Sequence, residues 1–185
     1  LGDHPDVLVA MNPAALVTNV GRLGGEGAII VNSDNFEERD VQKAGLESNP
    51  LDDGSLKNFR VYKVPMTSLT IEAVKGIGVK ARDAERSKNF FALGVINWLY
   101  NRPQEPTLEY IEKKFGKKPL VAESNRLAFK AGWNFGETCE LWDVAYDIAP
   151  ADLPVGEYTK VSGNQATAWG MIAAGQLAKL PVFLG

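Results

Sequence analysis

Residues 6–32, DVLVAMNPAALVTNVGRLGGEGAIIVN, decide the fold class of this 185-residue chain. The short apolar runs at 6–11 and 28–32 are rich in β-branched residues, which is typical of buried strands in a parallel sheet. Between them, Asn12 and Pro13 favour a helix start, because asparagine caps helix N-termini and proline suits the first helical position. Strand, helix and strand in this spacing predict a βαβ unit and an α/β fold.

The remaining chain predicts one more strand, a helical half and a second, smaller unit. Residues 59–64 alternate apolar and polar side chains, as a strand does. We expect helices at 36–43, 67–74, 81–100, 107–115 and 122–137, the last one capped by residues 123–125. The Pro-rich run 149–156 has the composition of a linker. Beyond it we expect a strand at 158–162, a helix at 163–179 and a strand at 181–185.

Composition excludes several classes of protein. Apolar residues make up 45% of the chain and charged residues 23%, without the run of roughly 20 apolar residues that a membrane-spanning helix needs. A net charge of -3 gives no basic footprint for nucleic acid. The single cysteine, Cys139, cannot form an internal disulfide or hold an iron–sulfur cluster alone, and the single histidine, His4, cannot form a metal site unaided.

The glycine-rich run 21–27 resembles a phosphate-binding loop in composition but has the wrong position. A dinucleotide-binding loop leads from a strand into a helix, so that the helix N-terminus faces the phosphates. This run leads from a helix into a strand, which favours a helix end and a turn. The same argument disfavours a fragment of a Rossmann-type dehydrogenase.

Two places remain as candidates for ligand contact. Asn12 follows a parallel strand, where ligands dock on open sheets, and is either a plain helix cap or a cap beside a binding site. Arg86, Lys88 and Asn89 offer two cations and an amide where we expect a helix to begin, which suits a phosphorylated ligand such as coenzyme A or, equally, a solvated basic turn. The sequence shows no nucleophile–base pair, carboxylate pair or metal cluster.

Several stretches together resemble one family of enzymes. They are PDVLVAMNPAAL at 5–16, NPLDDGSL at 49–56, VPMTSLT at 64–70, KNFFALG at 88–94, KAGWNFGET at 130–138, SGNQA at 162–166, AAGQLA at 173–178 and VFLG at 182–185. In this order they are similar to the fused gamma–alpha subunit of bacterial 2-oxoglutarate:ferredoxin oxidoreductases. The likeness covers essentially the whole chain.

This resemblance implies a division of the chain. Residues 1–148 would be a three-layer, gamma-type α/β domain on the coenzyme A side, with a helical C-terminal half and its N-terminal part missing. Residues 149–161 would be a linker, and residues 162–185 the truncated start of a thiamine-diphosphate-binding-like α/β domain of the alpha, pyrimidine type. The family's glycine-rich loop would precede Leu1 and its Tyr-Pro-Ile-Thr-Pro motif would follow Gly185, so this piece alone is expected to be inactive.

The resemblance also implies a function. It is the coenzyme A-acylating oxidative decarboxylation of a 2-oxoacid in the cytoplasm, with electrons passed to ferredoxin. Thiamine diphosphate, Mg²⁺ and an iron–sulfur cluster would belong to a partner beta subunit, in a dimer of alpha–beta heterodimers. Asn89, with Lys88 or Arg86, would contact coenzyme A, and Asn12 is a weaker candidate. The alternative is a non-catalytic assembly domain whose helical half, residues 81–137, binds no ligand.

Overall fold

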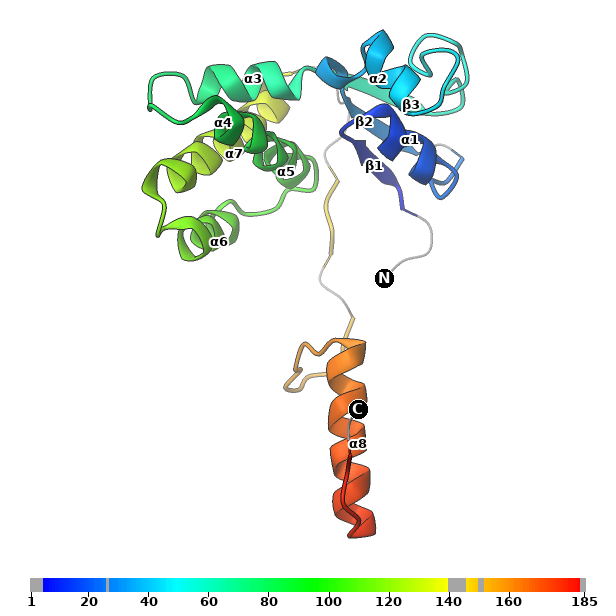
Figure 1. The fold of residues 1–185 in the computed structure, drawn as a ribbon, viewed down its shortest axis with the longest axis vertical. Helices are drawn as coiled ribbons and strands as arrows, with labels where there is room; N and C mark the ends of the chain where they lie inside the picture. The colour runs from blue at the N-terminus through cyan, green and yellow to red at the C-terminus, as the bar shows by residue number, and fades with distance from the viewer. Residues whose placement is uncertain (1–4, 26, 140–145, 150–151, 184–185) are drawn as a thin grey trace. The chain divides into compact units, whose positions relative to one another are not determined.

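The computed structural model describes residues 5–25, 27–139, 146–149 and 152–183 (Figure 1). His4 and residues 184 and 185 of the expected last strand lie outside the described residues. The chain divides into two compact units, Leu1–Ile148 and Ala149–Gly185.

A three-stranded parallel sheet forms the centre of the first unit. Its strands are β1 (Val7–Ala10), β2 (Ala28–Asn32) and β3 (Arg60–Val64), in the order β1-β2-β3. All five residues of the central strand β2 are buried. Strand β1 pairs with β2, and β2 with β3, both in parallel, which confirms the predicted parallel sheet. The continuous apolar run of β2 follows from its burial on both faces.

Helices cover the two faces of this sheet. Ile29 and Val31 of β2 pack with Leu16 of helix α1 (Pro13–Val20) on one face. Ile30, which lies between them in the strand, packs on the other face with Phe91, Val95 and Ala128 of two later helices. Successive side chains of a strand point to opposite faces, so β2 joins two separate clusters of the core. The predicted α/β fold is confirmed.

Short helices follow the second and third strands. A 3-10 turn, η1 (Ser33–Asn35), and helix α2 (Glu38–Lys43) follow β2, so the helix expected at 36–43 begins two residues later than predicted. After the loop 44–59 and strand β3, helix α3 (Met66–Ala73) takes the place of the helix expected at 67–74.

The helical half consists of α4 (Ala81–Arg86), α5 (Lys88–Leu99), α6 (Glu105–Phe115) and α7 (Pro119–Thr138). Helices α5 and α7 approach closely because glycines face each other. A Cβ atom on Gly94 would lie 2.8 Å from the backbone nitrogen of Trp133 and would collide with the carbonyl oxygen of Phe129. The phenyl rings of Phe91 and Phe135 lie 5.8 Å apart in the same interface.

Two predictions in this half are wrong. Instead of the single helix expected at 81–100 there are two, α4 and α5, with the one residue Ser87 between them. The Ser87 hydroxyl lies 3.1 Å from the carbonyl oxygen of Asp83 and 2.8 Å from two side chains of α7. Residues 123–125 do not cap a helix, because α7 already begins at Pro119, a residue that favours the first helical position. Ser124 and Asn125 are instead buried within α7.

The second unit contains helix α8 (Gly163–Ala178). Its predicted start is confirmed, since the Ser162 side chain accepts a hydrogen bond of 3.3 Å from the Gln165 backbone N–H. The strands expected at 158–162 and 181–185 are not found in residues 152–183. No strand lies beside either segment there, and a strand needs a neighbour for its ladder of hydrogen bonds. No described helix is both long enough and apolar enough to cross a bilayer.

Candidate functional site

The carboxyl ends of the three strands meet at one edge of the sheet. Asn12 follows β1, the η1 turn follows β2, and the first turn of α3 follows β3. Ligands of open α/β sheets bind at this kind of edge, which makes it a candidate ligand site.

Side chains of the chain itself fill much of this edge. The amide group of Asn32 donates to the Thr67 hydroxyl at 2.9 Å and accepts from the Thr67 backbone N–H at 3.3 Å. The Asp34 carboxylate accepts from the Ser68 backbone N–H at 2.8 Å and from the Ser68 hydroxyl at 3.1 Å. Pro65, at the cap position of α3, has no side-chain cap bond of its own. The side chains of Asn32, at the end of β2, and Asp34 therefore cap α3 and occupy N–H groups that could otherwise bind an anion.

Asn12 is a helix cap in the structure. Its side-chain oxygen accepts a hydrogen bond of 2.8 Å from the Ala15 backbone N–H at the start of α1. The residue is exposed and lines a cavity of 220 Å³ together with Asp40 and Lys43. Neither Arg86 nor Lys88 nor Asn89 lines that cavity. A ligand role for Asn12 stays a prediction.

The other candidates lie together where α4 meets α5. Arg86 places a guanidinium nitrogen 3.8 Å from the Asp83 carboxylate, and Lys88 places Nζ 3.1 Å from the Glu85 carboxylate. Asn89 is exposed on the first turn of α5. Both cations thus have an acidic neighbour one turn away, and the Arg86 side chain is largely exposed, whereas the Lys88 side chain is 16% exposed.

The junction differs from the free helix start that the sequence predicts. Ser87 keeps a right-handed helical backbone, its N–H bonds to the Asp83 carbonyl, and its carbonyl accepts from the Phe90 and Phe91 N–H groups. Backbone bonding of the helical kind therefore continues through Ser87 from α4 into α5. An anion here would be bound by side chains more than by unpaired N–H groups of a helix end.

Sequence reasoning missed the polar cluster beneath this junction. The Ser87 hydroxyl lies 2.8 Å from the Ser124 hydroxyl and 2.8 Å from the Asn125 side-chain oxygen, and all three residues are buried. One signal was available. Ser87, Ser124 and Asn125 interrupt the apolar side of two helical patterns, where polar residues are rare unless they bond to one another.

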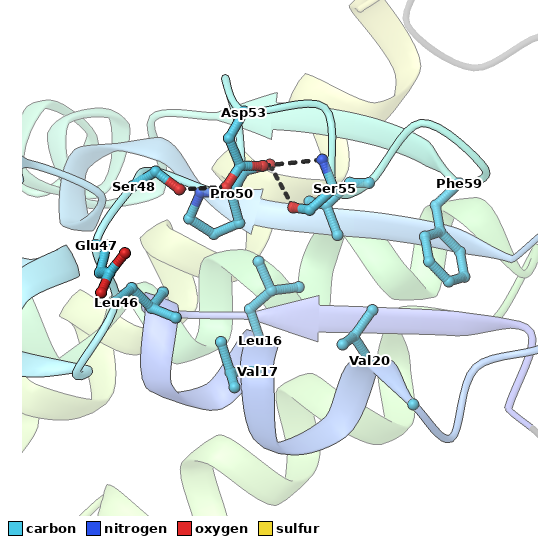
Figure 2. A pocket seen from close by; sticks show the side chains of 12 residues that line it. Leu16, Val17, Val20, Leu46, Glu47, Ser48, Pro50, Asp53, Ser55 and Phe59 are labelled. Atoms are coloured by element: carbon cyan, nitrogen blue, oxygen red, sulfur yellow. Dashed lines mark hydrogen bonds between the residues drawn. The ribbon is translucent and has the colours of Figure 1, made fainter.

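Figure 2 shows a larger cavity on the α1 face of the sheet, between α1 and the loop 46–59. Its volume is 430 Å³, and Leu16, Val17, Val20 and Phe59 give it apolar walls. Its ionisable lining residues are Glu47 and Asp53, with no lysine or arginine, so it does not suit a phosphate group. The sequence did not indicate this cavity.

Hydrogen bonds fix one wall of this cavity. The Asp53 carboxylate accepts from the Ser48 hydroxyl at 2.6 Å and from the Ser55 N–H at 2.9 Å. These bonds, that of Ser48 first, hold the pKa of the Asp53 carboxyl below its ordinary value. In the described part of the chain, His, Cys, Asp and Glu side chains do not gather in groups of three that could hold a metal ion.

Comparison with known proteins identifies the family. The sequence profile of the family described as pyruvate ferredoxin/flavodoxin oxidoreductase matches residues 1–135. The chain is 53% identical over 184 residues to 2-oxoglutarate oxidoreductase subunit KorA of Mycobacterium tuberculosis, covering 100% of the chain and 28% of that protein. It is 28% identical over 121 residues to the alpha subunit of 2-oxoacid:ferredoxin oxidoreductase 1 of Aeropyrum pernix, covering 64% of the chain and 18% of that protein.

A solved structure agrees with this assignment. The structure of 2-oxoglutarate:ferredoxin oxidoreductase from Magnetococcus marinus, with 2-oxoglutarate, coenzyme A and succinyl-CoA bound, matches with a TM-score of 0.58 and 25% sequence identity. The match covers 82% of the chain and 23% of that protein. The chain thus spans less than a third of the length of each of these relatives. The resemblance noted in the sequence is confirmed, and the chain belongs to the pyruvate ferredoxin/flavodoxin oxidoreductase family.

Proposed function

We propose that this chain is part of the alpha subunit of a 2-oxoglutarate:ferredoxin oxidoreductase. The enzyme would convert 2-oxoglutarate and coenzyme A into succinyl-CoA and carbon dioxide and pass two electrons to ferredoxin. The observation that carries this proposal is the 53% identity to KorA along the whole chain. The ligands named for the Magnetococcus enzyme, which are this substrate, this co-substrate and this product, support it.

The cofactors of the reaction would lie on a partner beta subunit. Thiamine diphosphate with Mg²⁺ would stabilise the carbanion formed on decarboxylation, and an iron–sulfur cluster would carry the electrons. The described residues offer no cluster of metal ligands that fits either metal group. The family resemblance supports a cytoplasmic dimer of alpha–beta heterodimers with ferredoxin as the electron acceptor.

We further propose that the two units have separate roles. Residues 1–148 would form the gamma-type, coenzyme A-side domain, residues 149–161 a linker, and residues 162–185 the start of the alpha-type domain. The division of the chain after Ile148 supports this arrangement. Helix α8 supports it as well, because it has no charged residue and none of its residues is buried. A helix that is uncharged and mostly apolar around its circumference is normally covered by other protein.

Within the first unit, the α4–α5 junction is the place proposed to contact coenzyme A. Arg86 and Lys88 could bind phosphate oxygens, and the exposed amide of Asn89 could bond to phosphate or to the amides of the pantetheine arm. The short spacing of these three residues along the chain supports this role. Asn12 is the weaker candidate, because its side-chain oxygen already caps α1.

Replacing Asn89 by Ala in the assembled enzyme tests this site. We expect the apparent KM for coenzyme A to rise about threefold to tenfold, as the loss of one or two hydrogen bonds predicts, while the KM for 2-oxoglutarate is unchanged. Asn134→Ala, at an exposed position of α7, is the matched control and should leave both constants unchanged. An unchanged KM for coenzyme A in Asn89→Ala would contradict the assignment.

A substrate panel tests the reaction. The assembled alpha–beta enzyme should reduce a viologen dye fastest with 2-oxoglutarate and more slowly with pyruvate or branched 2-oxoacids. A preference for pyruvate would overturn the substrate assignment while leaving the family assignment in place.

A further inference from the structure

The α4–α5 junction is attached to α7 by a small set of buried polar side chains. The Ser87 hydroxyl lies 2.8 Å from the Ser124 hydroxyl, 2.8 Å from the side-chain oxygen of Asn125 and 3.1 Å from the Asp83 carbonyl. A serine hydroxyl donates one bond and can accept two. The single hydrogen of the Ser87 hydroxyl can go to the Asn125 side-chain oxygen or to the Asp83 carbonyl, and in either case the Ser87 oxygen can accept a hydrogen bond from the Ser124 hydroxyl.

Unlike apolar packing, these contacts require particular partner atoms. Ser87 is 1% exposed, Ser124 is 0% exposed and Asn125 is 4% exposed, so water cannot replace a missing partner. A buried polar group without a partner is costly, and the position of the Ser87 backbone is therefore fixed by the two α7 side chains.

Ser87 is adjacent in the chain to the residues proposed to contact the ligand. Ser87 lies between Arg86 and Lys88 in the chain and is followed within two residues by Asn89. The Arg86 side chain is 64% exposed, and Asn89 is exposed as well, whereas Ser87 points into the protein. The Lys88 side chain is 16% exposed. Fixing Ser87 thus sets the directions in which the side chains of Arg86, Lys88 and Asn89 extend from the junction.

We propose that Ser87, held by Ser124 and Asn125, is a positioning residue that orients Arg86, Lys88 and Asn89 toward coenzyme A. This inference rests on the proposed coenzyme A role of the junction and adds to it a mechanism that keeps the junction in place. Ser87 itself does not contact the ligand. Its effect on coenzyme A passes through these three neighbours.

The test is Ser87→Ala in the assembled enzyme, with coenzyme A and 2-oxoglutarate titrated separately. Loss of one positioning hydrogen bond should raise the apparent KM for coenzyme A about threefold to tenfold and leave the KM for 2-oxoglutarate unchanged. Thr70→Val is the matched control. It removes another buried hydroxyl, which donates to the Met66 carbonyl at 2.6 Å in α3, and should change neither KM.

A double-mutant cycle with Asn89→Ala separates positioning from general destabilisation. Because Ser87 acts in part through Asn89, Ser87→Ala should have a smaller effect on the KM for coenzyme A when Asn89 is already Ala. Fully additive effects, or a lowered thermal stability with no change in that KM, would overturn the positioning role. Ser124→Ala, which keeps the Ser87–Asn125 bond, should show a smaller rise of the same kind and replaces Ser87→Ala in the test if that variant does not assemble.

The outcomes also separate this inference from the proposed function. An Asn89→Ala enzyme with an unchanged KM for coenzyme A would contradict the ligand site, and with it the positioning role. A raised KM in Asn89→Ala, with no change in Ser87→Ala, would contradict the positioning role alone.

Discussion

At the scale of single residues, Gly94 determines how closely α5 can approach α7. Replacing it by Ala should reduce the free energy of unfolding by about 1–3 kcal/mol, because the new methyl group meets backbone atoms of α7 that cannot move aside. Urea unfolding followed by tryptophan fluorescence would measure this, since Trp133 lies at the contact. Gly21→Ala is the control. Gly21 has a φ of -66° and no atom within 4 Å of an added Cβ, so unfolding should change little. Equal changes in the free energy of unfolding for the two variants would contradict the role of Gly94 in this close approach.

Asp53 provides a residue-scale prediction about pH. Its pKa is lowered in the folded protein, so the carboxylate contributes stability that is present above the unfolded pKa of about 3.9 and is lost as the pH falls through the folded value. Ser48→Ala removes the largest cause and should raise the pKa of Asp53 toward its ordinary value. Carboxyl-carbon NMR titration would measure it. Ser68→Ala, which removes a hydroxyl from Asp34 instead, should leave the Asp53 titration unchanged.

Residue types alone predicted the Asn12 cap but not the polar cluster around Ser87. Asn12 before Pro13 predicted a cap, and the Asn12–Ala15 bond confirms it, because capping depends on residues close in the chain. The Ser87 cluster could not be predicted in the same way. Ser124 and Asn125 follow Ser87 by 37 and 38 positions, and only the packing of α7 on the α4–α5 junction brings them to it.

At the scale of elements, α3 shows a cap supplied from another part of the chain. Asp34 lies 34 positions before Ser68, whose N–H and hydroxyl it accepts. Asp34→Ala should reduce the free energy of unfolding by about 1 kcal/mol, as the loss of a helix cap usually does, and should speed amide hydrogen exchange at Ser68.

The matched control for this cap is Asp52→Ala. It removes an exposed ion pair of 3.0 Å with Lys63, a kind of contact that contributes little to stability. If Asp34→Ala and Asp52→Ala changed stability equally, or if exchange at Ser68 stayed slow in Asp34→Ala, the capping role would be wrong.

The elements themselves were largely predictable, while their ends were not. The continuous apolar run of β2 predicted a strand because both of its faces are buried. The division of 81–100 at Ser87 escaped prediction because the 3.6-residue apolar pattern continues across it. The strands expected around α8 failed for another reason. Strand pairing depends on a neighbouring strand, and residues 152–183 do not supply one.

At the scale of the whole molecule, α8 should be covered by other protein. Trp169, Met171, Ile172 and Leu177 are exposed on it, and its sequence has no charged residue. We expect the amides of residues 163–178 to exchange slowly in the assembled enzyme, as in a buried helix. Hydrogen exchange read by mass spectrometry would test this, with the exposed segment 152–161 as an internal comparison. Exchange in α8 as fast as in that segment would contradict the proposed second domain.

The central claim is that this chain serves a coenzyme A-dependent 2-oxoglutarate:ferredoxin oxidoreductase. The most direct measurement is the initial rate of viologen reduction by the assembled alpha–beta enzyme with saturating 2-oxoglutarate, in the absence and in the presence of coenzyme A. We expect sustained reduction only when coenzyme A is present, with succinyl-CoA formed in proportion to the electrons transferred. Sustained reduction that is equally fast without coenzyme A, or no reduction with 2-oxoglutarate under either condition, would contradict it.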